Sequence, residues 1–359
     1  MRAPTTPEAR RPRDVRLRAA LLAFPTVRDR LIPAQVRWVL RRLRRAGHAA
    51  YLVGGCVRDL LLGRPPGDWD VTTSAEPAVV QRTFPRTRPT GIQHGTVTVL
   101  AGNRPVEVTT FRTEGGYSDR RRPDWVRFTP SLEEDLARRD FTINAMALDA
   151  DGRLVDPFGG LQDLTAGVVR AVGDPEERFR EDALRMLRAI RFAAQLEFIL
   201  DPATLGAIAR HAALLDHVSR ERIRDEFSKL LLAPHPADAL RLLKSTGLLE
   251  RFLPELLEGD GVAQNVHHAY TVFDHNIRAC QEAPPALHLR LAALLHDIAK
   301  PRCLSIDERG ERHFYHHEVV GAQMADEILR RLRYDNATRR RVVHLVRHHL
   351  ALHHYPDMT

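Results

Sequence analysis

The chain has 359 residues, 43% hydrophobic and 28% charged, so it can form two or more globular domains. No apolar run approaches the roughly 20 residues of a membrane span, and the first residues lack a secretory signal, so we expect no membrane partner. The net charge of +8 favours a polyanionic partner such as nucleic acid. Three scattered cysteines indicate free thiols in a reducing, cytoplasmic location.

The elements predicted from the N-terminal side form a sheet with flanking helices. Residues 1–33 are expected to be a basic tail and linker ending in a short basic helix. Apolar residues at helical spacing, closed by a glycine, predict a helix near 34–47. Alternating segments then predict strands, and short periodic segments predict helices. The strands are expected at 49–53, 68–73, 94–102 and 104–112, and the helices at 56–63 and 77–84.

The pattern changes at about residue 161 and is almost entirely helical from there, apart from a possible short hairpin near 302–315. We therefore predict an α/β head over 34–165, a helical neck and body over 166–262, and a helical domain over 263–359. The sequence indicates no oligomeric state.

The segment 51–77, YLVGGCVRDLLLGRPPGDWDVTTSAEP, carries the strongest chemical signal. Asp68 and Asp70 are two apart in a predicted strand, so their carboxylates would point to one face. Two adjacent carboxylates are costly unless a cation lies between them. Gly54 and Gly55 form a turn whose amides can face phosphate. The combination favours Mg²⁺-assisted phosphoryl or nucleotidyl transfer, and the alternative is a polar turn after two prolines.

Glu107 is the candidate for a third carboxylate. Val106 and Val108 should face one side of its strand and Glu107 the other. If this strand lies beside residues 68–73, three carboxylates converge, and two can bridge metal ions about 3.5–4 Å apart. The alternative is a solvated strand residue.

Arg138, Arg139 and Asp140 are clustered just before a predicted apolar helical segment. The planar guanidinium matches phosphate oxygens, and Asp140 can accept a hydrogen bond from a ribose hydroxyl. The alternative is a charged helix N-terminus with Asp140 as its cap.

The segment EDALRMLRAIRF is predicted to be one helix, with Asp182 and Arg185 side by side on one face. A carboxylate accepts from an exocyclic amine and a guanidinium donates to a ring nitrogen or carbonyl. Such a pair can select cytosine and adenine over uracil and guanine without a template. Arg188 and Arg191 are expected to buttress the helix. The alternative is an ordinary surface ion pair.

Five segments, in order, resemble the class II tRNA nucleotidyltransferase and bacterial poly(A) polymerase family. They are GGCVRD with DWD, EVTTFRTEGGYSDRRRP, RRDFTINAMA, DPFGGLQDL and EDALRMLRAIRF. The resemblance implies an α+β fold with a polymerase-beta-like head. It also implies Mg²⁺ on Asp68 and Asp70, with Glu107 as third carboxylate. The nucleotide-binding residues that we assign with it are Gly54, Gly55, Arg58, Arg139, Asp140, Asn144, Asp182, Arg185, Arg188 and Arg191.

In that family the reaction joins CTP and ATP to the tRNA 3′ end, completing CCA or its terminal A. Residues 113–128 are predicted to be a mobile loop, which by the resemblance favours addition of the final A. A poly(A) polymerase acting on general RNA 3′ ends remains the alternative, because both activities share these motifs.

Most of the 18 histidines lie in residues 264–359. His296 and Asp297 end an apolar helix, with His275 upstream, and this segment resembles the HD phosphohydrolase superfamily. The resemblance implies a second divalent transition metal on these three residues, with a structural or RNA-positioning role and a metal-dependent phosphohydrolase as alternatives. The superfamily needs a further aspartate, for which Asp357 is the late candidate, so we expect the chain to be truncated.

Overall fold

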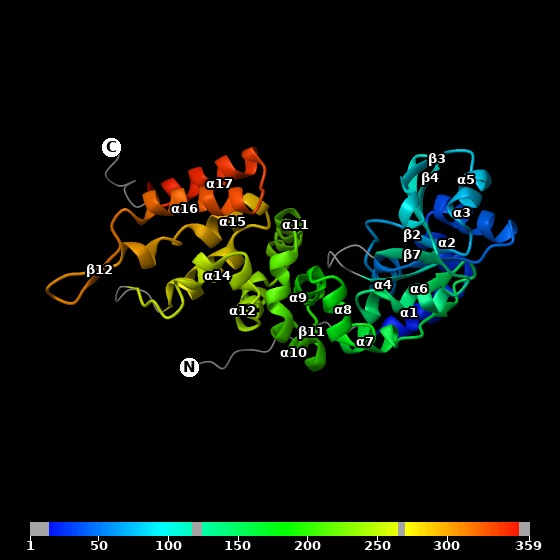
Figure 1. Cartoon of the computed structure of the whole chain (residues 1–359), viewed down its shortest axis with the longest axis horizontal. Helices are drawn as coiled ribbons and strands as arrows, with labels where there is room; N and C mark the ends of the chain where they lie inside the picture. Colours follow the sequence, from blue (N-terminus) through cyan, green and yellow to red (C-terminus); the bar gives the residue numbers. More distant parts are fainter. Residues whose placement is uncertain (1–13, 117–123, 265–269, 352–359) are drawn as a thin grey trace. The chain divides into compact units, whose positions relative to one another are not determined.

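The computed structural model describes residues 14–116, 124–264 and 270–351 (Figure 1). The chain forms two compact units. The head unit comprises residues up to Asp182 together with Ile199–Thr204, and the helical unit comprises Ala183–Phe198 and the residues from Leu205 onward. Among the described residues, no helix has the length and apolar character needed to cross a membrane.

The elements of the head unit alternate between short helices and strands, as the sequence predicts. In chain order they are α1 (Val15–Leu22), α2 (Pro25–Leu31), α3 (Ala34–Arg45), β1 (Ala50–Val53), α4 (Gly55–Leu62), β2 (Asp70–Thr73), α5 (Pro77–Thr83), β3 (Thr87–Gly91), η1 (Ile92–His94), β4 (Thr96–Ala101), β5 (Arg104–Thr110), β6 (Arg112–Gly115), β7 (Trp125–Phe128), α6 (Leu132–Ala137), η2 (Thr142–Asn144), β8 (Ala147–Asp149), β9 (Leu154–Val155), α7 (Gly160–Ala166), β10 (Val168–Val169), α8 (Pro175–Glu181) and β11 (Ile199–Leu200).

A seven-stranded mixed sheet, in the order β3-β4-β5-β2-β1-β8-β9, organises the head unit. The β2–β5 pair is parallel and the other neighbours are antiparallel. On β5, Val106 and Val108 are buried whereas Glu107 is exposed, which confirms the predicted alternation. The parallel register sets Asp70 opposite Glu107. The strand that carries Glu107 therefore lies beside β2, as the sequence analysis required for three converging carboxylates.

In the described part of residues 1–33 the predicted short helix is present as two helices, α1 and α2, but they are not a linker outside the head. Helix α1 packs against α4 and α7, and its side chains Val15 and Leu22 are buried. Gly152 allows this close packing, because a Cβ there would lie 1.9 Å from the Leu22 carbonyl oxygen. These helices therefore belong to the head unit.

Two further expectations about local structure are corrected. The predicted mobile loop 113–128 contains most of an antiparallel ribbon, in which β6 pairs with β7, while residues 117–123 lie outside the described part. The segment after Asp140 is the 3₁₀ turn η2 followed by strand β8, not a helix. Strands β7 and β8 have four and three residues and no apolar–polar alternation, so periodicity gives no strand signal there.

The helical unit confirms the predicted change of pattern. Its elements are α9 (Leu184–Leu196), the remainder of α10 (Pro202–His211), η3 (Ala212–His217), α11 (Arg220–Leu231), α12 (Pro236–Ser245), η4 (Leu249–Arg251), α13 (Pro254–Leu257), α14 (Val272–Glu282), α15 (Leu287–Leu295), η5 (Lys300–Cys303), β12 (Ser305–Ile306), β13 (Arg312–His313), α16 (His317–Arg331) and α17 (Asn336–His348). The possible hairpin near 302–315 is present as β12–β13.

Candidate active site and histidine cluster

The carboxylate cluster, Asp68, Asp70 and Glu107, lies where β2 begins beside β5. Strand β2 starts only at Asp70, and Asp68 occupies the bend before it, so the premise of one strand carrying both is wrong. The alternation nevertheless holds, because Trp69 between them is buried while Asp68 is exposed. Burial and then the charge of Glu107 raise the pKa of Asp70, with Asp68 adding to the effect and Arg139 opposing it. Oxygen donors that repel one another in this way suit Mg²⁺.

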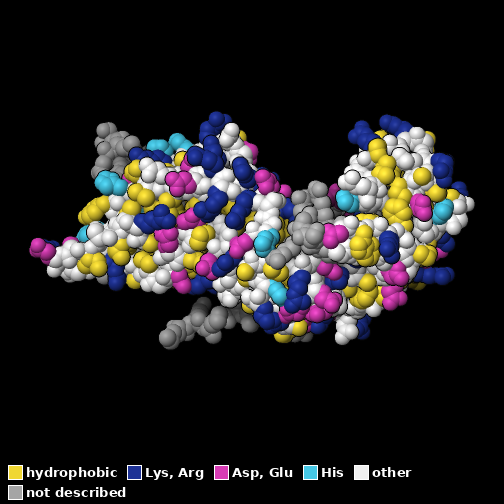
Figure 2. All heavy atoms as spheres, viewed as in Figure 1, with side chains coloured by type: hydrophobic (Ala, Val, Ile, Leu, Met, Phe, Trp, Pro, Cys, Tyr) yellow, Lys and Arg dark blue, Asp and Glu magenta, His cyan; other side chains and the backbone are white. Residues whose placement is uncertain are grey.

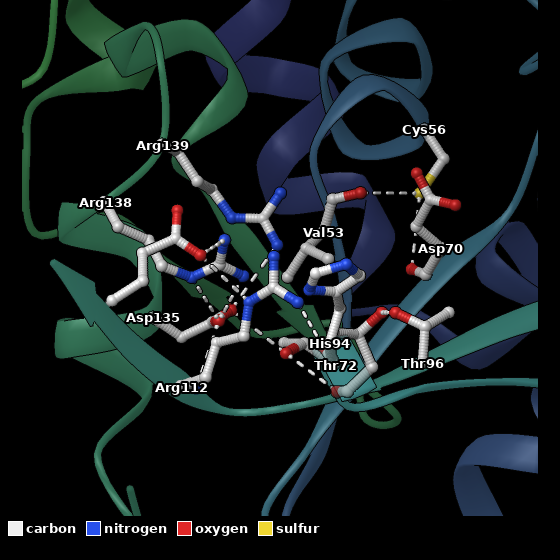
Figure 3. Close-up of polar contacts among 12 residues, drawn as sticks. Val53, Cys56, Asp70, Thr72, His94, Thr96, Arg112, Asp135, Arg138 and Arg139 are labelled. Atoms are coloured by element: carbon white, nitrogen blue, oxygen red, sulfur yellow. Dashed lines mark hydrogen bonds and ion pairs between the residues drawn. The ribbon is translucent and has the colours of Figure 1, made fainter. Parts of the chain in front are cut away.

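The guanidinium of Arg139 lies at the Gly54 turn, close to the carboxylate cluster. Gly54 has φ +73° and a Cβ there would lie 3.1 Å from Nη1 of Arg139, so a side chain would obstruct the guanidinium. The Cys56 thiol donates a hydrogen bond to the carbonyl of Val53 at 3.2 Å and so links α4 to the end of β1 (Figure 3). The turn therefore offers backbone amides and Arg139 together, which suits a phosphate group.

Three of the predicted nucleotide-binding residues form one hydrogen-bonded chain. Arg58 is buried and donates to Oδ1 of Asn144 at 2.7 Å. Asn144 in turn donates to Oδ1 of Asp140 at 3.1 Å, and Asp140 also accepts from the amide of Phe141 at 2.9 Å. The chain fixes the orientation of Asp140, which sequence reasoning placed near the ribose.

Sequence reasoning missed Asp135, the central carboxylate of this region (Figure 3). Its side chain is 0% exposed and accepts from Arg138 Nη2 at 2.7 Å, Arg139 Nη2 at 3.4 Å and Thr72 Oγ1 at 3.0 Å. Burial opposes its ionisation, but the two guanidinium groups outweigh burial and hold its pKa below the usual range. The spacing of an acid with arginines at i+3 and i+4, at and just after the C-terminal end of α6, was the available signal.

The predicted single helix over EDALRMLRAIRF is interrupted. Asp182 follows α8 in an extended conformation and α9 begins at Leu184, so Asp182 and Arg185 do not share a helix. Within the helical unit, Arg191 pairs with Glu226 at 2.5 Å and Arg188 approaches it at 3.8 Å, as expected of buttressing residues. Base selection by Asp182 and Arg185 stays a prediction.

The histidine cluster of the helical unit is larger than predicted. His275, His296 and Asp297 come together as expected, and His317 and His349 join them on the other carboxylate oxygen. Asp297 Oδ2 lies 3.4 Å from His275 Nε2 and 3.2 Å from His296 Nε2, and Oδ1 lies 3.2 Å from His317 Nε2. The late candidate Asp357 lies outside the described residues.

Backbone carbonyls fix how these rings face the cluster. Nδ1 of His296, His317 and His349 lies 2.8, 2.6 and 2.8 Å from the carbonyls of Ala293, Phe314 and Val346. A carbonyl only accepts, so each Nδ1 donates and, in the neutral ring, each Nε2 presents a lone pair to the cluster. Lone pairs facing a carboxylate favour a cation among them. The Lys300 ammonium already lies 2.8 Å from Asp297 Oδ2, and the converging imidazoles are also the arrangement of a metal site.

Comparison with known proteins agrees with this geometry. The profile described as the Poly A polymerase head domain matches residues 50–170, the probable RNA and SrmB-binding site of polymerase A matches 197–259, and the HD domain matches 266–358. The crystal structure of the Bacillus stearothermophilus CCA-adding enzyme in complex with CTP is 37% identical and covers 89% of this chain and 71% of that one, with a TM-score of 0.65. The chain belongs to the CCA-adding enzyme family.

Another relative in this family is the CCA-adding enzyme of Anoxybacillus flavithermus, which is 55% identical over 218 residues. That match covers 61% of this chain and 55% of the relative, so the chain spans about half the length of the curated relatives it matches. The Thermotoga maritima CCA-adding enzyme complexed with tRNA shares the fold, with 21% identity, 96% of this chain and 76% of that chain covered, and a TM-score of 0.64.

Proposed function

We propose that this chain is a template-independent nucleotidyltransferase that adds CCA, or its terminal A, to the tRNA 3′ end from CTP and ATP. The observation that carries the proposal is the parallel register of Asp70 with Glu107, beside Asp68 and the Gly54 turn. The CTP complex of the Bacillus stearothermophilus relative supports the choice of a nucleotide substrate. In the reaction, the terminal ribose hydroxyl attacks the α-phosphate and pyrophosphate leaves.

The residues predicted from the sequence divide this work. Asp68 and Asp70 would hold Mg²⁺, with Glu107 as a third oxygen donor, and the ion when bound would lower the hydroxyl pKa and neutralise phosphate charge. Arg139 at the Gly54 turn binds the triphosphate. Asp140, held by Asn144, orients the ribose. Asp182 and Arg185 select cytosine and adenine.

The test uses two tRNA substrates, one lacking only the terminal A and one lacking all of CCA, each with labelled CTP or ATP. We expect the shorter tRNA to gain C residues and then A, and the longer one to gain a single A. Extension of only the longer tRNA would assign addition of the terminal A alone. Long A ladders on unrelated RNA would make the protein a poly(A) polymerase. No labelled product, or equal product from Asp68→Ala with Asp70→Ala, would refute the proposal.

A second candidate function rests on the histidine cluster. We propose that His275, His296, Asp297, His317 and His349 hold a divalent transition metal, because four imidazoles converge on one buried carboxylate. Elemental analysis of protein loaded with Ni²⁺ or Mn²⁺ should give stoichiometric metal in the head variant Asp70→Asn and reduced metal in His296→Ala. Release of phosphate from a 2′,3′-cyclic ester, lost in His296→Ala, would extend the proposal to hydrolysis. Equal metal content in Asp70→Asn and His296→Ala would refute the proposed metal site.

We also propose a cytoplasmic location. Cys56 and Cys280 are buried, Cys303 is half-buried, and none of the three forms a disulfide. Free thiols of this kind fit a reducing compartment. Cell fractionation with an antibody to the chain checks the proposal, and recovery in a secreted or membrane fraction would contradict it.

A further inference from the structure

One face of α3 is cationic and faces away from the core. The buried side chains of this helix are Val36, Val39, Leu40 and Leu43. The exposed side chains on the other face follow at i, i+3, i+4 and i+7, which places them in one row. They are Trp38, Arg41, Arg42 and Arg45.

This row borders a hollow of about 540 Å³ closed on its other side by Arg82 and Thr83 of α5. Arg42 fixes the two helices together, because its Nε donates to the Thr83 carbonyl at 2.6 Å. Trp38 packs its ring edge against Phe84, with 5.3 Å between centroids, and remains 38% exposed. We call this site the arginine hollow; it is lined by Arg37, Trp38, Arg41, Arg42, Arg45 and Arg82.

The charges of the arginine hollow are poorly balanced. Arg37 pairs with Asp29 at 2.6 Å. Arg41, Arg45 and Arg82 make no ion pair or hydrogen bond with their side chains within residues 14–116, 124–264 and 270–351. Elsewhere, on the face drawn in Figure 2, acidic side chains lie among the cationic ones. Several guanidinium groups around one concave site create a positive potential that attracts a polyanion.

We propose that the arginine hollow binds RNA, with the guanidinium groups on backbone phosphates and an unpaired base stacked on Trp38. The proposal rests on the proposed function, which makes RNA the substrate. Guanidinium forks match phosphate oxygens, and an exposed indole gives a base a stacking surface. Phe84 and the Arg42 guanidinium already contact part of the ring, and its exposed part is open to a base; an acidic protein segment would use the charges but not this exposed ring surface. None of the lining residues belongs to the carboxylate cluster, so this is a separate contact of the head unit.

The test measures binding of fluorescent tRNA by anisotropy between 50 and 200 mM salt. The variant is Arg41→Gln with Arg45→Gln, and the matched control is Arg309→Gln with Arg312→Gln, two exposed arginines of the helical unit. Each phosphate contact contributes about 0.9 to the slope of log affinity against log salt. Loss of two contacts should therefore lower the slope by about 2, so the affinity advantage of the parent over the variant should be at least about tenfold at 50 mM salt and shrink about tenfold by 200 mM. The control should bind like the parent.

A parent-like affinity and slope in the Arg41 and Arg45 variant would overturn the proposal. So would parent-level binding of single-stranded RNA by Trp38→Leu. If polyglutamate competes with RNA as well as unlabelled RNA does, the surface recognises acidic protein and the proposal is also wrong. Failure of the proposed function looks different, because the parent then binds tRNA but incorporates no nucleotide. Circular dichroism melts confirm that each variant is folded.

Discussion

Replacing Asp135 by Asn tests whether the buried carboxylate stabilises the head unit and positions its arginines. Asn keeps the shape and the acceptor for Thr72 but removes the charge that faces Arg138 and Arg139. Breaking a buried charge pair costs about 3–5 kcal/mol. We expect about 3 kcal/mol, at the lower end of that range, because Arg138 keeps a contact with Glu114 at 3.3 Å.

Tryptophan fluorescence in urea measures this loss for the head unit alone, because all three tryptophans, Trp38, Trp69 and Trp125, lie there. The matched control is Glu133→Gln on the exposed face of α6, which should stay within about 0.5 kcal/mol of the parent. In the variant Asp135→Asn we also expect a raised KM for the nucleoside triphosphate, because Arg139 loses its anchor.

The contribution of Asp135 to the free energy of unfolding should depend on pH, because only its ionised form pairs with the arginines. The pKa of Asp135 is held below its usual range, so its stabilising charge is present above the unfolded pKa of about 3.9. That contribution is lost as the pH falls through the folded pKa. The stability difference between parent and Asp135→Asn should therefore be full at neutral pH and shrink in acid. A difference below about 1 kcal/mol at pH 7, or one that grows in acid, would refute the reasoning.

Two further predictions concern the Gly54 turn and the thiols. Gly54→Ala should lower incorporation at least about tenfold, since its methyl group would lie 3.1 Å from a guanidinium nitrogen at φ +73°. The control Gly67→Ala, with nothing within 4 Å of its Cβ, should keep parent activity, and equal rates would contradict the account. Burial raises the pKa of all three thiols, to about 12 for Cys56 and Cys280, and only Cys303 is partly exposed, so iodoacetamide at pH 8 should label Cys303 first. Peptide mapping measures the order, and equal labelling rates would disagree.

The sequence predicts those parts of the site that depend on local periodicity. Alternation of Val106, Glu107 and Val108 is enough to place Glu107 on the open side of β5. Glycine conformational preference predicts the turn at Gly54 and the end of α4 at Gly63, which has a left-handed conformation. Because these features need only near neighbours, they can be read without the fold.

The parts that sequence reasoning missed depend on contacts between distant segments. Asp135 meets Thr72 across 63 residues, and helical spacing alone does not reveal that partner. His317 and His349 reach Asp297 only because α15, α16 and α17 pack together. The apolar spacing around Asp182 continues through the break between α8 and α9, so periodicity predicts one helix where the chain forms two.

The most direct test of the carboxylate cluster is single-turnover incorporation of labelled CTP into tRNA lacking CCA, by the parent and by Asp70→Asn. Loss of a metal-binding oxygen at the reacting phosphate should remove several kcal/mol of transition-state stabilisation, which is at least about a 100-fold loss of rate. We predict this loss with unchanged tRNA affinity. Incorporation by Asp70→Asn at the parent rate would contradict the account.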